Sequence, residues 1–215
     1  MSNDAPHTNA TWNDACLAAA IVAIAPHAIG GIVLRARSGP VRDVWLAHLK
    51  SLLSETMPLR RVPLNAGDDR LLGGLDLSAT LAQGRPVAER GLLAEADGGL
   101  LVIPSAERLD GGRTARIVRT LDYGRVEMER DGLSAKLPAR FGIIALDEGV
   151  EPDETVPTAL RDRLAIWLSL DGLSLRDTAI EPAWPTRIAT ARRLLPETSA
   201  DANLATLFCE AGCAL

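Results

Sequence analysis

The chain has 215 residues and a formal net charge of −5 at neutral pH. This length suffices for one sizeable hydrophobic core, or for a core with a small appendage. The acidic balance of charge gives no basis for binding to nucleic acid or to an acidic membrane surface.

Residues 1–10 are polar, lack the basic start of a secretory signal and are expected to be disordered. The apolar stretch 16–34 is interrupted by proline, histidine and glycines, so no membrane span is predicted. The three cysteines, Cys16, Cys209 and Cys213, form an odd, low count that favours reduced thiols and a cytoplasmic protein. With no histidine near the C-terminal pair, we expect buried thiols rather than metal ligands, and no metal site.

The N-terminal half alternates helical and strand patterns. Residues 12–25 are rich in alanine and leucine and predict a helix that Pro26 ends. An apolar strand over 31–35 is followed by Gly39 and by a helix that opens at Pro40. Apolar residues recur in this helix at i, i+3 and i+4, and His48 on the same face is expected to be packed. Next come a strand over 59–64, short helices over 75–83 and 88–96, and a strand over 99–104.

The C-terminal half continues the alternation. It predicts a helix over 113–122, a hairpin over 125–138 with Asp131-Gly132 as its turn, strands over 141–146 and 164–170, and helices after Pro182. The strands are apolar on both faces and alternate with helices. This pattern is typical of an α/β fold with a parallel sheet covered by helices.

Four segments, in their order and spacing, carry a resemblance to a known family. They are "GGIVLRARSGPVRDVWL" (30–46), "DDRLLGGLDLSATLAQGRPVAERGLLAEADGGLLVI" (68–103), "VEMERDGLSAKLPARFGIIAL" (126–146) and "ALRDRL" (159–164). From about residue 12 to its end the chain resembles the AAA+ module of magnesium chelatase, specifically that of the D subunits. The resemblance implies an AAA+ core of the P-loop NTPase type, with a five-stranded parallel sheet, helices on both faces, a β-hairpin insertion and a truncated helical lid.

The same resemblance implies a division of the chain. Residues 11–182 would form the α/β core, and residues 183–215 would begin the helical lid or linker. D subunits of the family continue into an acidic Pro-rich linker and an integrin-like domain. We therefore expect that the chain is truncated before them.

The strand–loop–helix at 31–52 stands where a nucleotide-binding protein carries its phosphate loop, but the family's chemistry is missing. Aligned on Gly39, the first loop glycine is Ala36, the glycine before the lysine is Val41, the lysine is Arg42, and the Mg²⁺-binding Ser/Thr is Asp43. A β-branched residue resists positive φ. A carboxylate close to a phosphate costs about 4 kcal/mol at a surface-like dielectric constant. We therefore expect no tightly bound nucleotide.

The other catalytic positions of the family have changed as well. The strand that should end in Asp-Glu ends in Pro104-Ser105, which can neither bind Mg²⁺ nor polarise an attacking water. Where the family has an asparagine after the next strand, this chain has Asp147 and Glu148. Their loop is otherwise interpreted as a solvated acidic turn.

Two elements are predicted to face partners. The resemblance places Asp162 and Arg163 on the family's Asp-Arg pair, in which the arginine reaches a neighbour's ATP, and Arg161 is the candidate if the register shifts by two. The alternative for Arg163 is an ion pair with Asp162 or another surface acid. The hairpin would contact the ATPase or the porphyrin-binding subunit, or else be merely solvent-exposed; its charged residues are Arg125, Glu127, Glu129, Arg130 and Lys136.

The resemblance implies a subunit of an enzyme complex that is itself catalytically inactive. It would scaffold and activate the ATP-hydrolysing I subunit for insertion of Mg²⁺ into protoporphyrin IX on the H subunit, in bacteriochlorophyll or chlorophyll synthesis. ATP and Mg²⁺ would lie at the interface with the I subunit. Two alternatives stay open: a diverged but active ATPase, and an AAA+-derived adaptor of another metal-insertion or chaperone complex.

Overall fold

A five-stranded sheet in the order β2-β5-β8-β1-β9 forms the centre of the molecule, and every neighbouring pair of its strands is parallel. The computed structural model describes residues 11–63, 65–130, 133–151, 153–181, 183–199 and 202–213. This confirms the predicted parallel α/β sheet. In sheet order its strands are β2 (Leu59–Arg61), β5 (Leu100–Ile103), β8 (Gly142–Asp147), β1 (Gly31–Arg35) and β9 (Ile166–Ser169).

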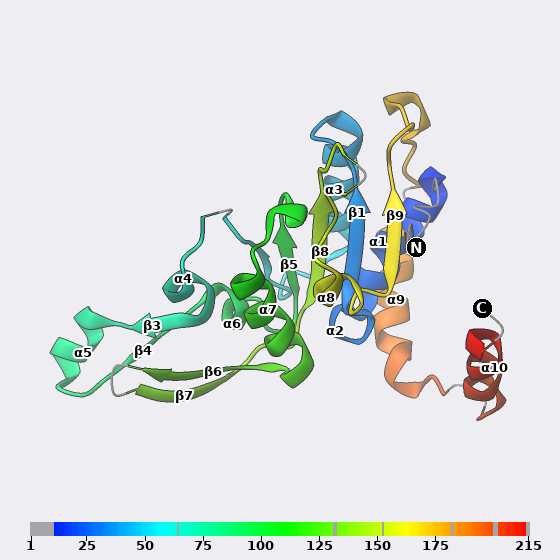
Figure 1. Ribbon diagram of the computed structural model, residues 1–215. Helices are drawn as coiled ribbons and strands as arrows, with labels where there is room; N and C mark the ends of the chain where they lie inside the picture. The colour runs from blue at the N-terminus through cyan, green and yellow to red at the C-terminus, as the bar shows by residue number, and fades with distance from the viewer. Residues whose placement is uncertain are drawn as a thin grey trace.

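One face of the sheet is covered by three helices, α1 (Trp12–Ile24), α3 (Pro40–Leu52) and α9 (Trp184–Leu194) (Figure 1). Side chains alternate along each strand, so Ile32 and Leu34 of β1 face this layer and Val33 faces the other. The indole of Trp45 is fully buried and donates to the carbonyl of Ala15 at 2.8 Å, which joins α3 to α1.

The opposite face packs against a second layer of helices, one long and three short, and against the base of a hairpin. Its buried side chains include Leu71, Leu93, Ile117 and Leu160, one from each helix. These helices are α4 (Asp68–Leu72), α6 (Leu92–Glu95), α7 (Gly111–Tyr123) and α8 (Thr158–Arg161). Helices therefore cover both faces, as predicted.

Two β-ribbons extend from one end of the sheet (Figure 1). The hairpin β6 (Arg125–Arg130) and β7 (Leu133–Pro138) confirms the predicted insertion, although its Asp131-Gly132 turn lies outside the described residues. The other ribbon consists of β3 (Gly73–Leu75), α5 (Leu77–Gln83) and β4 (Ala88–Arg90).

The prediction of a helix over 88–96 is wrong in its first half. Residues 88–90 pair antiparallel with β3, and the helix begins only after Gly91. A Cβ atom on Gly91 would lie 2.3 Å from the backbone nitrogen of Gly73, so the two chain segments meet at a distance that only glycine allows. This close approach lies between the end of β4 and the start of α6, which is one turn long.

Other boundaries differ by a few residues. A short helix, α2 (Pro26–Ile29), follows α1 directly, and the strand expected over 59–64 pairs only through β2. The last described helix is α10 (Ala202–Cys213).

Cys16 is buried as expected, whereas Cys209 is exposed and the prediction that its thiol is buried is wrong. Among the helices that the structure describes, none combines the length and the apolar character that crossing a membrane requires.

Candidate functional site

The altered positions meet at the carboxyl edge of the sheet. The loop after β1 carries Gly39, the end of β5 carries Ser105, and the end of β8 carries Glu148. Since these three strands are neighbours and parallel, their carboxyl ends lie together, as at the ligand-binding edge of open α/β sheets. The backbone N–H of Ala36 donates to the carbonyl of Asp147 at 3.0 Å and ties the loop to the end of β8.

Arg42, at the position of the family's lysine, lies in the first turn of α3 with a side chain only 10% exposed. Its Nη1 forms an ion pair with the Glu148 carboxylate, and its Nη2 donates to the Ser38 hydroxyl at 2.8 Å. Its buried Nε has no hydrogen-bond partner among the described residues. The chain's own carboxylate thus neutralises the cation that would face a phosphate.

Ser105 completes the same cluster from the end of β5. Its hydroxyl donates to Oε2 of Glu148 at 3.2 Å. Ser105 is the one non-glycine residue in the described part of the chain with a left-handed backbone, at φ 44° and ψ 51°. Such a conformation costs about 1–3 kcal/mol and persists where the surroundings impose it. We call this cluster the Arg42–Glu148–Ser105 network.

Asp147 forms a second ion pair beside the network. Its side chain is 1% exposed and accepts from Nη1 of Arg35 at 3.2 Å and from the N–H of Gly149 at 3.0 Å. The prediction of a solvated acidic turn is therefore wrong for Asp147, and Glu148 has its carboxylate held in the network. The physical reason is position: β8 lies between β5 and β1, and Asp147, its last residue, is in register with Arg35 at the end of β1.

The roles of Arg35 and Glu107 were not predicted from the sequence. Arg35 ends β1 in register with Asp147 at the end of β8, and the N–H of Glu148 donates to Oε2 of Glu107 at 3.0 Å. The sequence holds a signal for the pair of Arg35 and Asp147, because each of these residues ends a predicted parallel strand.

The hollow beside the loop is small. The hollow along residues 36–42 and 170–173 has a volume of about 180 Å³, whereas small-molecule sites are usually about 300–1,000 Å³. Gly39 is extended, at φ 166° and ψ 176°, a conformation that any residue adopts. Three carboxylates, those of Glu107, Asp147 and Glu148, lie together at the end of β8. No group of residues able to hold a metal ion occurs in the part of the chain that the structure describes.

Arg163 lies away from this network, just after α8. Its Nε and Nη2 donate to the two oxygens of Asp122 at 2.7 and 2.8 Å, and Nη1 donates to the carbonyl of Ala159 at 2.8 Å. This hydrogen bonding from Arg163 lowers the pKa of Asp122, and the same contact raises the pKa of Arg163. Within the single chain Arg163 thus pairs with a surface acid, on α7 rather than at Asp162. Its role toward a neighbour stays a prediction.

The residues before Arg163 have other surroundings. The guanidinium of Arg161 lies 5.2 Å from the centre of the Trp167 ring, and its Nε is buried without a hydrogen-bond partner among the described residues. Asp162 is exposed. The packing of Arg161 against an aromatic ring favours a structural role for it.

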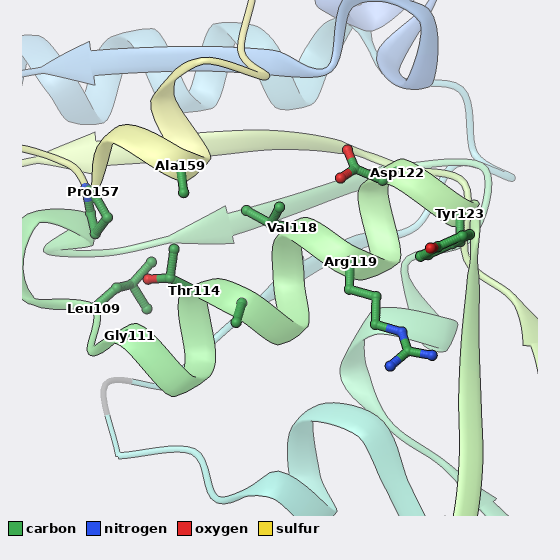
Figure 2. A pocket seen from close by; sticks show the side chains of 10 residues that line it. Leu109, Gly111, Thr114, Val118, Arg119, Asp122, Tyr123, Pro157 and Ala159 are labelled. Carbon is green, nitrogen blue, oxygen red and sulfur yellow. The ribbon is translucent and has the colours of Figure 1, made fainter.

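Surface hollows flank the Arg163–Asp122 pair. A hollow of about 740 Å³ lies over α7 and α8. Figure 2 shows two of its lining side chains, Val118 of α7 and Ala159 of α8, on the facing sides of these helices. A second, of about 340 Å³, is lined by residues 27–30 together with Leu121, Asp162 and Arg163. Asp122 lines both. The pair therefore stands on an uneven surface that a neighbouring protein could contact.

The hairpin carries a small exposed charge cluster. Glu127 accepts from Arg119 and from Arg125, each at 2.9 Å, and Lys136 lies 3.8 Å away. These cations lower the pKa of Glu127, with the hydrogen bond from Arg125 as the largest cause. The side chains of Glu129 and Arg130 lie outside the described part of the chain. Contact of the hairpin with a partner stays a prediction.

The chain is similar to subunits of magnesium chelatase. It is 38% identical over 207 residues to the 60 kDa subunit of Cereibacter sphaeroides, covering 94% of this chain and 34% of that protein. To the 38 kDa subunit of Rhodobacter capsulatus it is 31% identical over 150 residues, covering 69% of this chain and 40% of that protein. No protein-family model matches the sequence.

A solved structure supports the fold. A chain of the complex between subunits BchI and BchD of magnesium chelatase, based on a single-particle cryo-EM reconstruction, superposes with a TM-score of 0.60 at 24% identity, covering 90% of this chain and 66% of that one. The chain spans only 34% of the length of the 60 kDa relative.

Proposed function

The chain is a homologue of magnesium-chelatase subunits, and from that premise we propose that it is a D-type AAA+ subunit that does not itself hydrolyse ATP. In this role it scaffolds and activates an ATP-hydrolysing I-type subunit in the cytoplasm. The complex would insert Mg²⁺ into protoporphyrin IX on an H-type subunit. The match to the 60 kDa relative covers 94% of this chain, against 69% for the 38 kDa relative, and favours the D type.

The Arg42–Glu148–Ser105 network carries the proposal that the chain is not a hydrolase. An active phosphate loop needs a free cation for the phosphates, and here that cation is already paired. Glu148 would have to leave Arg42, and it would then stand as an uncompensated charge beside the incoming phosphates. A like-charge contact of this kind costs about 4 kcal/mol at an effective dielectric constant of 20. A micromolar affinity amounts to only about 8 kcal/mol.

Arg163 is the residue that we propose to act on the partner. ATP and Mg²⁺ would lie at the interface, bound mainly by the I-type subunit. The guanidinium of Arg163 would donate hydrogen bonds to the γ-phosphate and stabilise the charge that develops there during transfer to water. A subunit can contribute such an arginine to its neighbour's hydrolysis of ATP without having a nucleotide site of its own. The exposed position of Arg163 supports this role, since 36% of its side chain is accessible.

The decisive test is a titration of Mg·ATP into the purified chain, following heat and phosphate release, with an I-type subunit as the positive control. We expect neither binding nor hydrolysis by this chain. Phosphate release that is lost in Arg42→Ala would contradict the proposal and indicate a diverged active ATPase. Binding to a different ATPase, without binding to the I-type subunit, would instead indicate an adaptor of another complex.

A further inference from the structure

The backbone at Arg163 is held by an unusually close approach of another segment. Gly30, between α2 and β1, has φ +71°, and a Cβ atom there would lie 2.0 Å from the carbonyl oxygen of Arg163. The N–H of Ala165 donates to the carbonyl of Ile29 at 3.2 Å. Both the positive φ and the contact require glycine, so the chain around Arg163 is fixed against the start of β1.

The side chain of Arg163 is held as firmly as its backbone. A guanidinium has five N–H groups, and three of them are engaged: two by Asp122 and one by the carbonyl of Ala159. Each terminal nitrogen donates one bond, so Nη1 and Nη2 each keep one N–H with no partner in the described parts of the chain. The guanidinium is planar, and its direction is therefore set while two donors stay available.

The contribution of the Arg163–Asp122 pair to the stability of the folded chain does not by itself account for these contacts. Exposed ion pairs contribute about 0–1 kcal/mol, and immobilising an arginine costs up to about 2 kcal/mol of side-chain entropy. The side chain of Asp122 is 44% exposed and that of Arg163 is 36% exposed, so the pair is strongly solvated. What the contacts do achieve is a fixed orientation of a cation on the surface.

We propose that Asp122 is a positioning residue, which aims the two remaining N–H groups of Arg163 at a phosphate held by a neighbouring subunit. This inference rests on the proposed function of Arg163. Orientation in advance removes the entropy cost of ordering the arginine when the neighbour's nucleotide reacts. The hollows on both sides of Asp122 leave room for the neighbour's surface around the pair.

The test is a reconstitution with an I-type ATPase subunit and Mg·ATP, in which kcat, KM for ATP and complex formation are measured. Asp122→Ala is compared with Arg163→Ala and with the double variant. The matched control is Asp68→Ala, which frees Arg116, an arginine of α7 that pairs with Asp68 at 2.6 Å, the two side chains each being 38% exposed. We expect Asp122→Ala to lower the partner's kcat on the order of tenfold, at unchanged KM and unchanged assembly.

The remaining expectations identify how Asp122 acts. The double variant should be no slower than Arg163→Ala, Asp122→Glu should recover part of the rate, and Asp68→Ala should match the unchanged chain. In the isolated chain, the NMR signal of the Arg163 Nε–H should exchange slowly with water and should lose this protection in Asp122→Ala. A thermal melt confirms that each variant is folded.

The outcomes separate the two proposals. If Arg163→Ala leaves the partner's kcat unchanged, the trans role of Arg163 is wrong and the inference falls with it. If Arg163→Ala slows the partner but Asp122→Ala does not, only the positioning role is overturned. A faster partner with Asp122→Ala would also overturn it, because Asp122 would then be restraining Arg163.

Discussion

At the carboxyl edge of the sheet, single side chains pair with one another beside the P-loop-like segment. Arg42 keeps a positive charge where the family has lysine, and the charge alone would be compatible with an anion site. Within the chain, the carboxylate of Glu148 forms an ion pair with Arg42 and neutralises its charge. Ser105, held in a left-handed conformation, supports the carboxylate from the other side. The roles of Arg42, Glu148 and Ser105 therefore depend on one another, because Glu148 accepts hydrogen bonds from both of the other residues.

The first prediction concerns the stability of this network. Glu148→Ala leaves Arg42 buried and unpaired and should lower the free energy of unfolding by about 2–3 kcal/mol, as for a charged hydrogen bond that loses its partner. The double variant Arg42→Met/Glu148→Leu removes both charges and should be less destabilised than Glu148→Ala alone. Urea unfolding followed by circular dichroism measures both. Equal stability of Glu148→Ala and the unchanged chain would contradict the ion pair.

A second prediction concerns His48, which is 3% exposed on α3 and lies 6.3 Å, ring centre to ring centre, from Trp184 of α9. Its Nε2 has no hydrogen-bond partner among the described residues, and burial lowers its pKa below the ordinary value of 6.5. The unfolded chain therefore binds a proton more readily than the folded one. The stability contributed by neutral His48 is present above about pH 6.5 and is lost as the pH falls below it.

His48→Phe keeps a ring on the buried face of α3 and removes the titration. We expect the fall in melting temperature between pH 7 and pH 5 to be smaller in this variant than in the unchanged chain. His27→Asn, at an exposed histidine of α2, is the control. Identical pH profiles for His48→Phe and the unchanged chain would contradict the prediction.

At the scale of elements, α9 follows the last strand of the sheet in the chain and packs in the same helical layer as α1 and α3. Arg192 donates to the carbonyl of Ala23 at the end of α1 at 2.7 and 2.9 Å, and to the carbonyl of Leu52 at the end of α3 at 2.6 Å. Carbonyls at helix ends lack intrahelical partners, and a cation there also suits the helix dipole. One side chain thus joins the ends of two helices to a third.

The third prediction follows from this joint. Arg192→Ala should destabilise the chain by about 2 kcal/mol, because the helix-end carbonyls lose charged donors. Arg192→Lys should recover only part of this loss, since an ammonium lacks the planar fork. Chemical denaturation provides the measurement, and Arg193→Ala, at the next residue of α9, is the control. A loss in Arg193→Ala equal to that in Arg192→Ala would show that the joint is not specific.

At the scale of the whole molecule, the network lies at the carboxyl edge of the sheet and the Arg163–Asp122 pair joins α7 to the segment after α8. The β-ribbons extend from one end of the sheet (Figure 1). The carboxyl edge of the sheet carries the internal contacts of the network. The side that bears α7 and α8 presents an oriented arginine. The hairpin β6–β7 extends a charged surface away from the core. This division suits a subunit that acts on its neighbours rather than on a ligand of its own.

The fourth prediction tests the hairpin as a contact surface. Arg125→Glu combined with Lys136→Glu reverses two exposed charges beside Glu127. If the hairpin contacts the I-type or H-type subunit, the affinity should fall about tenfold, the equivalent of about 1.4 kcal/mol. Affinity is measured by sedimentation at low and moderate salt. Arg187→Glu, on α9, serves as the control for an exposed charge reversal, and unchanged assembly in the hairpin variant would leave the hairpin as merely solvent-exposed.

Much of the fold could be predicted because the relevant patterns are local. Apolar runs in the strands and i, i+3, i+4 spacing in α3 depend only on neighbours in the chain, and both led to the correct elements. The error at residues 88–90 arose because β4 exists only through pairing with β3 and through the close approach of Gly91 to Gly73. Local propensity contains neither contact.

The sequence by itself determined which side chains stand at the positions predicted for the Walker motifs, and the identity of a side chain limits the chemistry it can do: Pro104 has no oxygen in its side chain to bind Mg²⁺, and Val41 is not a glycine. Only the tertiary structure decided what stands in its place. Arg42 and Ser105 lie 106 and 43 residues from Glu148 along the chain, and Arg163 lies 41 residues from Asp122. The parallel order of the strands brings the first three residues to one edge, and the packing of α8 on α7 brings the last two together. Charges so distant in sequence leave no local pattern, so their pairing emerges only when the sheet and its helices are assembled.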